Sequence, residues 1–505
     1  MKNLYNKMAR GWGGDILALA AGVVLPFAFA PYNQIYLSLL SPALLIALWL
    51  SSSAKRAFVR GYLYGIGYFG LGVSWVAVSM YRFGGMSMPL ATIATSLFVL
   101  IWAFIPALVS FIAVRYFQRA RLPVKLLLIM PSLWMFFEWV RSWLFTGFPW
   151  ILLGYSHVDG PLAGFGPIFG VYGISWLLMF CAGLLVLAVL EHGKWRYYYG
   201  GALLATFALG LALNQIQWTH PYKQPIKASL IQGNIPQDIK WNPDQRLPTI
   251  DLYTRLTREH WDSDLIIWPE TALPAYYHQA EEFLNELGAQ ARAHHTDMLI
   301  GLPVVDFSHG TARYYNALMS LGTKTDFYYK RHLVPFGEYL PLKSVFGSLL
   351  DFFQIPMADF SPGPKEKSYL EVAGVKAGIS ICYEDVFGEE VIQALPQANI
   401  LVNVSNDAWF GDSFAPHQHL QKARMRSIET GRPMLRATNN GISAFIDPKG
   451  RIISVSPQFK EYVLTGEVQP MTGSTPFSLY GNWLVLGFSV LCLVGGFYVV
   501  RKRAN

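Results

Sequence analysis

The sequence predicts an α-helical membrane domain joined to a separate α/β domain. Hydrophobic residues make up 53% of the 505-residue chain and charged residues only 14%, and the mean hydropathy is +0.30. This composition is too apolar for an ordinary soluble protein of this length. Between residues 218 and 480, by contrast, the apolar runs become short and are separated by turn residues. The change in pattern indicates two domains of different kinds.

Eight apolar segments are candidates for membrane-spanning helices, because about 20 apolar residues cross the hydrocarbon core of a bilayer. They lie near residues 13–30, 33–50, 59–80, 88–114, 122–141, 165–190, 197–217 and 481–500. We expect residues 1–217 to form a transmembrane domain with seven spans and residues 218–480 an extramembrane domain. Residues 481–505 then form a final transmembrane helix and a basic tail. The N-terminal stretch also resembles a cleavable signal peptide, but its apolar pattern continues into the second segment, which favours a retained helix.

Basic residues are unevenly distributed among the loops that connect these segments. Fifteen Lys and Arg residues lie in the two tails or beside the ends of alternate segments, whereas the intervening short loops hold only Arg82 and Arg141. Short loops rich in Lys and Arg remain on the cytoplasmic side of a membrane. We therefore expect both termini to be cytoplasmic and residues 218–480 to lie on the opposite side.

The formal net charge of +8 does not indicate nucleic-acid binding. Residues 218–480 hold 23 Lys and Arg against 28 Asp and Glu, so the positive excess belongs to the membrane part. A nucleic-acid-binding domain carries its basic excess on the face that contacts phosphates. This distribution excludes nucleic acid as the expected partner.

Candidate strands and helices alternate within residues 218–480. The strands are predicted at 228–234, 265–268, 298–305, 316–321, 326–329, 375–381, 400–404, 444–447 and 452–455, and the helices at 245–260, 279–294, 386–395 and 417–430. Strands mixed with helices predict an α/β domain.

One cysteine lies where a predicted strand turns into a predicted helix. The apolar run from Val375 ends at Cys382, and a polar turn leads into the helical pattern at 386–395. A thiol at a helix N-terminus lies in positive potential, which lowers its pKa and raises the thiolate fraction. The alternative is a buried structural cysteine.

The number of cysteines favours a reactive thiol. Cys181 and Cys492 lie inside predicted spans, so Cys382 is the only cysteine of residues 218–480. An unpaired thiol in an oxidising compartment is a candidate nucleophile. Thiols attack acyl carbons and give thioesters, whose acyl group passes to water or to an amine.

Two further strands end in charged residues that suit this chemistry. The apolar run after Asp264 ends at Glu270, and the aromatic run after Phe327 ends at Lys330, with Glu338 in the Pro/Gly turn that follows. An acid, an amine and a thiol that each end an apolar strand can converge at one edge of a sheet. A neighbouring base and cation assist acyl transfer to and from a thiol. Ordinary solvated charges at strand ends are the alternative.

These three motifs together resemble the nitrilase superfamily, in which a Glu-Lys-Cys triad occurs in this order. With the apolar segments, the whole chain is similar to the apolipoprotein N-acyltransferase family. The resemblance implies an α-β-β-α sandwich in which Glu270 is the general base, Lys330 the cation that stabilises the oxyanion and Cys382 the nucleophile. It also implies substrate-binding, gating or supporting roles for Trp241, Glu338, Tyr383 and Glu384. Arg331 and His332 directly follow the lysine and are a possible local departure.

The resemblance also implies a substrate class and a location. Members of the family move an acyl chain from a phospholipid, typically phosphatidylethanolamine, to the cysteine and then to the α-amino group of a diacylglyceryl-modified N-terminal Cys of an apolipoprotein. No cofactor is implied. The location is the bacterial inner membrane, with the catalytic domain on the periplasmic side. The apolar stretch from Tyr339 to Phe360 is then expected to admit acyl chains, although an ordinary buried loop is the alternative.

Other functions remain open from the residues alone. A membrane-tethered amidase with the same triad would hydrolyse its thioester with water, and a transporter or scaffold would need no ordered triad. His417 and His419 are a weak metal-ligand pair, because this spacing on a helix does not direct both rings to one point. We expect no metal site.

Overall fold

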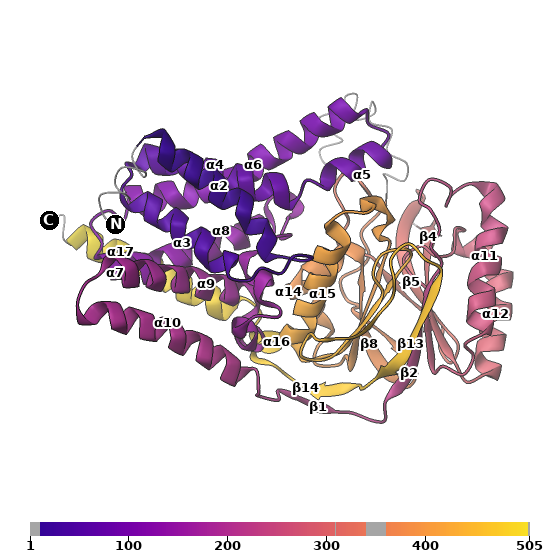
Figure 1. The fold of residues 1–505 in the computed structure, drawn as a ribbon. Coiled ribbons are helices and arrows are strands. Elements are labelled where there is room, and N and C mark those ends of the chain that lie inside the picture. The colour runs from indigo at the N-terminus through magenta and orange to yellow at the C-terminus, as the bar shows by residue number, and fades with distance from the viewer. Residues whose placement is uncertain (1–10, 309, 340–359, 503–505) are drawn as a thin grey trace. The chain divides into compact units, whose positions relative to one another are not determined.

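The structure is a computed structural model that describes residues 11–308, 310–339 and 360–502. The chain divides into two compact units, which Figure 1 shows as ribbons. Met1–Ala77, Pro89–Ile216 and Tyr480–Asn505 form the first, here called the helical unit. Val78–Met88 and Gln217–Leu479 form the second, here called the sandwich unit.

Helices fill the described part of the helical unit, and each of the eight apolar segments contains at least one of them. They are α2 (Trp12–Val24), α3 (Leu37–Leu50), α4 (Ala54–Gly72), α6 (Met88–Arg115), α7 (Leu122–Val124), α8 (Met130–Arg141), α9 (Gly166–Leu190), α10 (Lys194–Leu213) and α17 (Trp483–Lys502). Between α4 and α6 lies the short helix α5 (Val76–Arg82).

By length and composition, the described helices give four or five candidate membrane spans where the sequence predicted eight. Four are Met88–Arg115, Leu122–Arg141, Pro161–Leu190 and Trp483–Lys502. A fifth is the pair Ala54–Gly72 and Val76–Arg82, which is bent by 51°. Trp12–Ala28 and Leu37–Leu50 are apolar but shorter.

Small residues allow the helices of this unit to approach closely. A Cβ added to Gly22 would lie 2.0 Å from the carbonyl oxygen of Tyr64, and one added to Gly65 would lie 2.6 Å from the Cα of Ala103. Close backbone approach is the usual use of glycine between membrane helices. Gly22 and Gly65 therefore serve helix packing.

Two buried charges in α8 hold the irregular segment between α8 and α9. Glu138 accepts hydrogen bonds from Trp134 Nε1 at 3.0 Å and from the backbone N–H of Leu153 at 2.8 Å. Arg141 donates to the carbonyl oxygen of Phe148 at 3.0 Å and lies over the ring of Phe69. Both side chains are buried, so they hold this segment from inside the helical unit.

Two six-stranded sheets form the centre of the sandwich unit. One has the order β13-β2-β3-β4-β5-β6, and the other the order β12-β11-β10-β9-β8-β7. The strands of the first are β2 (Ile226–Gln232), β3 (Leu265–Ile267), β4 (Asp297–Asp306), β5 (Arg313–Leu321), β6 (Asp326–Tyr329) and β13 (Tyr462–Val468). Those of the second are β7 (Tyr369–Val372), β8 (Val375–Ile381), β9 (Ile400–Ser405), β10 (Met434–Thr438), β11 (Ala444–Ile446) and β12 (Ile452–Val455). A separate pair joins β1 (Thr219–Pro221) to β14 (Met471–Gly473).

Helices cover the outer faces of both sheets, as Figure 1 shows, so the unit has α, β, β and α layers. α11 (Pro243–Arg258) and α12 (Glu281–Ala293) cover the first sheet, and α15 (Ala415–Thr430) covers the second. One apolar core lies between the sheets and contains Leu230, Ile267, Ile379 and Val402. This layering agrees with the sandwich that the family resemblance implied.

The expected helix at 386–395 is wrong as one continuous element. The chain instead forms a 3-10 turn (Cys382–Val386), the short helix α14 (Gly388–Val391) and another 3-10 turn (Ile392–Ala394). The sequence also missed strands β7, β10 and β13 of the two sheets. The sequence pattern does not predict β10, because a charged residue, Arg436, lies at the centre of this strand.

The strand ends explain why the candidate residues meet. β2, β3 and β4 run parallel, while β5 is antiparallel to both β4 and β6, so β3 and β6 end at the same edge of their sheet. β8 and β9 run parallel in the other sheet and also end together. The expected convergence therefore involves the matching edges of two sheets and not one.

Candidate active site

Cys382 lies at a sharp, strained elbow between β8 and the following 3-10 turn. Its φ is +53°, in the left-handed region that a residue with a Cβ rarely occupies. Such a conformation costs about 1–3 kcal/mol and persists where surrounding contacts impose it. The side chain is half-buried. The elbow thus places a partly accessible thiol just beyond the end of β8.

Glu384 is the main support of this elbow. Its Oε2 accepts hydrogen bonds from the backbone N–H of Ile381 at 2.7 Å and from the hydroxyl of Tyr328 at 2.9 Å. Its Oε1 accepts from the backbone N–H groups of Arg331 and His332, at 2.6 and 3.1 Å. The carboxylate therefore joins the turn of Cys382 to the segment that follows Lys330.

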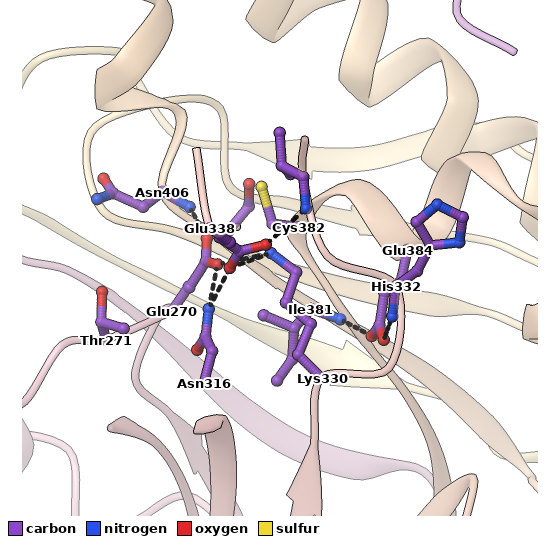
Figure 2. Close-up of polar contacts among 12 residues, drawn as sticks. Glu270, Thr271, Asn316, Lys330, His332, Glu338, Ile381, Cys382, Glu384 and Asn406 are labelled. Carbon is purple, nitrogen blue, oxygen red and sulfur yellow. Dashed lines mark hydrogen bonds and ion pairs between the residues drawn. The ribbon is translucent and has the colours of Figure 1, made fainter. Parts of the chain in front are cut away.

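Glu270 follows β3 and is held from three sides. Oε1 accepts from Asn316 Nδ2 at 2.8 Å and from Lys330 Nζ at 3.2 Å. Oε2 accepts from the backbone N–H of Asn406 at 2.9 Å. The side chain is almost entirely buried. Figure 2 shows its carboxylate and the sulfur of Cys382 in one cluster.

Lys330 is buried between two carboxylates. Besides Glu270, its Nζ donates to Glu338 Oε1 at 2.8 Å. Asn316 Nδ2 also bridges both acids, at 2.8 Å to Glu270 and 3.1 Å to Glu338. An ammonium group has three donors. Among the residues that the structure describes, two of these donors have acceptors, which leaves one N–H for a developing oxyanion.

The charges of the site define its resting state. Burial opposes ionisation of Glu270, but Lys330 and the amide of Asn316 outweigh it and lower the pKa of this carboxyl. Burial likewise opposes the charge of Lys330, yet Glu270 and Glu338 raise its pKa. At neutral pH the site therefore holds a carboxylate and an ammonium ion.

The thiol differs from the sequence-based expectation. Burial, followed by the charge of Glu270, raises the pKa of Cys382 well above its ordinary value, although Lys330 acts in the opposite direction. The expected lowering by a helix N-terminus is wrong, because Cys382 is the first residue of a 3-10 turn and does not directly precede an α-helix. The resting thiol is protonated, so its activation requires a base.

The remaining predicted residues lie beside this centre. Tyr383 is buried and packs edge-on against Phe387 and His332, with ring centroids 5.2 and 5.9 Å away. Trp241 is 36% exposed. It follows Lys240, whose buried Nζ donates to the carbonyl oxygen of Glu270 at 3.3 Å. Trp241 is therefore next in the chain to a lysine that contacts the backbone of Glu270.

Sequence reasoning missed the residues that end β9. Ser405 hydrogen-bonds to the thiol of Cys382, Asn406 supplies the backbone N–H that binds Glu270, and Asp407 binds His419 Nδ1 at 3.0 Å. The signal was present, because β9 is another apolar strand that ends in polar residues.

His417 and His419 both lie in the first turns of α15, and they have different surroundings. His419 is buried between carboxylates, whereas His417 is half-buried. Within residues 11–308, 310–339 and 360–502, no group of three or more His, Cys, Asp and Glu side chains is arranged to hold a metal ion. The apolar stretch that was expected to admit acyl chains lies outside the described residues, apart from its ends Tyr339 and Phe360.

The site brings together a protonated thiol, an ionised carboxylate and a buried ammonium ion. A carboxylate next to a thiol can remove its proton, and an ammonium ion can stabilise the oxyanion of a tetrahedral intermediate. This arrangement suits acyl transfer through a thioester.

Comparison with known proteins gives two matching family models and many close relatives. Residues 21–184 match the N-terminal domain of apolipoprotein N-acyltransferase, and residues 227–477 match carbon-nitrogen hydrolase. Apolipoprotein N-acyltransferase of Methylococcus capsulatus is 50% identical over 97% of this chain and 96% of its own. The enzymes of the same name from Coxiella burnetii and Azotobacter vinelandii are 40% and 42% identical, over 95% and 98% of this chain and 99% and 96% of theirs.

Proposed function

This chain belongs to the apolipoprotein N-acyltransferase family, and we propose that it transfers an acyl chain from a phospholipid to the N-terminal amine of an apolipoprotein. The observation that carries the mechanism is the cluster of Cys382, Glu270 and Lys330, in which an ionised base lies beside a protonated thiol. A ping-pong reaction through a thioester on Cys382 follows from these groups.

In the first half-reaction the thiol attacks the ester carbonyl carbon of the phospholipid. Glu270 removes the thiol proton as the sulfur–carbon bond forms, and the free N–H of Lys330 binds the oxyanion. The ester carbon–oxygen bond then breaks. Glu270 returns the proton to the departing alkoxide, so the lysophospholipid leaves as a neutral alcohol and the acyl group remains on the sulfur.

In the second half-reaction the α-amino group of the diacylglyceryl-modified Cys attacks the thioester carbon. Glu270 removes a proton from the attacking nitrogen, and Lys330 again binds the oxyanion. The carbon–sulfur bond breaks and the thiolate takes back the proton. The products are an N-acylated lipoprotein and the original enzyme.

The supporting residues have separate tasks in this proposal. Glu338 holds Lys330 and balances its charge, and Glu384 holds the elbow. Tyr383 and Trp241 border the centre and contact or gate the two lipid substrates. Phosphatidylethanolamine is the proposed donor, as the family resemblance implies, and no cofactor takes part.

We further propose that the chain crosses the bacterial inner membrane eight times. Residues 1–217 hold seven spans, residues 218–480 form the periplasmic catalytic domain, and residues 481–505 hold the last span and a cytoplasmic tail. Large apolar side chains of α10 support this count, because Leu204, Leu209 and Leu211 are each more than half exposed. Such side chains suit lipid better than water.

A membrane-tethered amidase is the alternative, because the same three groups hydrolyse amides when water takes the place of the amine. The acceptor of the thioester separates the two functions. An amidase releases free fatty acid and has no need of a lipopeptide amine.

Purified protein incubated with acyl-labelled phosphatidylethanolamine alone should acquire one acyl group on Cys382, detected by mass analysis of its peptide. It should also release an equal amount of lysophospholipid. A lipopeptide with a free N-terminal amine should then discharge the enzyme, whereas the N-acetylated lipopeptide should not. Label that reaches the lipopeptide without ever residing on Cys382 would contradict the thioester mechanism, and free fatty acid as the main product would favour the amidase.

Orientation has an independent test. A reporter that is active only in the periplasm should work when it is fused near Pro221 and fail when it is fused after Arg503. The reverse result would overturn the proposed topology.

A further inference from the structure

A fully buried ionic cluster contacts the backbone of Cys382 and has no part in the mechanism proposed above. It consists of Asp385, Asp407, His419 and Arg436, whose side chains are at most 1% exposed. Asp385 belongs to the elbow, Asp407 follows β9, His419 is in α15 and Arg436 is in β10. Four separate elements thus meet here.

His419 occupies the centre of this ionic cluster. Its Nδ1 lies 3.0 Å from Asp407 Oδ1, and its Nε2 lies 3.0 Å from Asp385 Oδ1. An oxygen acceptor faces each ring nitrogen, so both nitrogens must donate, and the ring is an imidazolium ion. With Arg436 bound to both carboxylates, two positive charges balance two negative ones.

Two contacts connect the ionic cluster to Cys382. His419 Nε2 also lies 3.2 Å from the carbonyl oxygen of Cys382, which receives a second hydrogen bond from Asn403 Nδ2 at 3.3 Å. Ser405 donates to Asp407 Oδ1 at 2.9 Å and hydrogen-bonds to the thiol. The first contact reaches the backbone of the nucleophile, and the second reaches its sulfur.

These contacts answer two physical requirements of the elbow. The left-handed backbone of Cys382 needs partners that hold it, and its carbonyl oxygen is fixed by His419 and Asn403. The forming thiolate needs a neutral or positive environment. Without the charge of His419, the two carboxylates and Arg436 would together carry a net negative charge. Ser405, which binds both Asp407 and the thiol, would connect this charge to the sulfur.

We propose that His419 is a positioning residue for the nucleophile. As an imidazolium ion between Asp385 and Asp407, it fixes the backbone of Cys382 and offsets the negative charge of these two buried carboxylates. This inference rests on Cys382 being the nucleophile proposed above. Among the described residues, the largest charges that act on the sulfur from outside the ionic cluster are those of Glu270, which follows β3, and Lys330, which follows β6. A substitution at His419 leaves both of them in place.

The test measures the reactivity of Cys382 without any lipid. Alkylation of the full-length protein by iodoacetamide is followed across pH by mass analysis of the Cys382 peptide. His419→Gln removes the positive charge, so the pH of half-maximal alkylation should rise by about one unit. Thioester formation from phospholipid at pH 7 should fall about tenfold or more, with an unchanged KM for phospholipid.

His417→Gln is the matched control, because it makes the same substitution two residues away on the same helix, at a ring that is not a member of the ionic cluster and whose pKa is lowered by burial despite the charges of Asp412 and Asp407. It should leave the alkylation profile and the rate of thioester formation unchanged. Folding of each variant is checked by its thermal unfolding in detergent. A folded His419→Gln protein with the wild-type alkylation profile would overturn the proposal, as would an equal shift in His417→Gln.

Ser405→Ala provides a second variant if His419→Gln does not fold. It removes only the hydroxyl that joins the thiol to Asp407 and leaves every charge in place. Because the hydrogen bond from Ser405 lowers the pKa of Cys382, its loss should raise the alkylation midpoint, by less than in a folded His419→Gln protein. An unchanged midpoint would overturn the role of the ionic cluster. Because alkylation needs no substrate, these results are independent of whether phospholipid charges wild-type Cys382, which tests the proposed function itself.

Discussion

Glu338→Gln tests how the charges of the active site are divided between base and cation. Lys330 is shared by Glu270 and Glu338 in the resting enzyme. Removing the charge of Glu338 leaves Glu270 as the only carboxylate of the described residues that is bound to Lys330. The base should then hold its negative charge more firmly and accept the thiol proton less readily.

The size of this effect follows from the contacts. The Oε1 atoms of Glu270 and Glu338 both accept from Asn316 Nδ2, at 2.8 and 3.1 Å. They are therefore at most about 6 Å apart, where Coulomb's law with an effective dielectric constant of about 20 gives about 3 kcal/mol of repulsion. Loss of that repulsion lowers the pKa of Glu270 by about 2 units. A weaker base of this kind should slow thioester formation about tenfold.

The assay is rapid-quench measurement of hydroxylamine-sensitive acyl label on Cys382 across pH. The acidic limb of the rate profile reports the ionisation of Glu270 and should move to lower pH by about 2 units, while the plateau falls. Glu371→Gln, which removes a carboxylate from an exposed pair with Lys324, should change neither quantity. An acidic limb that stays in place or moves to higher pH in folded Glu338→Gln would refute the charge-sharing model.

Three further variants probe the nucleophile, its support and the lysine behind the base. Cys382→Ser should fold and insert normally but lose more than about 10³-fold in turnover, because a hydroxyl is a far weaker nucleophile than a thiol; near-wild-type acyl transfer would remove the thiol from the mechanism. Glu384→Gln places an amide N–H₂ group opposite two buried hydrogen-bond donors, so the free energy of unfolding should fall by about 3 kcal/mol. Thermal unfolding measures this loss, and the control Glu389→Gln, at an exposed residue, should have no effect. Burial lowers the pKa of Lys240 from 10.5 to about 8. Between these two pH values the wild-type protein should therefore gain stability relative to Lys240→Met, by about 1.4 kcal/mol for each pH unit. A stability difference that does not change with pH would refute this prediction.

The sequence predicted most strands of the sandwich unit because their residues alternate or are uniformly apolar between turns. β8 and β6 were predicted to the residue, and β3 to within one. The missed strand β10 shows the limit, since Arg436 interrupts its pattern and is tolerated only because Asp385 and Asp407 neutralise it. Those partners come from distant parts of the chain, so no local pattern reveals them.

The same limit applies to the active site. A residue at the end of an apolar strand was a useful signal for Glu270, Lys330 and Cys382, because parallel strands bring their carboxyl ends together. The ionisation state of Cys382 was not predictable, because it depends on burial and on the charge of Glu270 from the other sheet. The bridging role of Asn316 was hidden for the same reason, since both of its partners are distant in sequence.

The resting charge state of the site bears on the periplasmic location proposed above, because the periplasm is an oxidising compartment. Oxidation and alkylation attack the thiolate, so a thiol with a raised pKa is protected while no substrate is bound. That protection would also make the enzyme inert unless a base were already ionised and in place. Glu270 meets this condition, because Lys330 and Asn316 keep it charged despite its burial. Placing the negative charge on the carboxylate and not on the sulfur lets Cys382 remain stable between turnovers and react when an ester carbonyl reaches it.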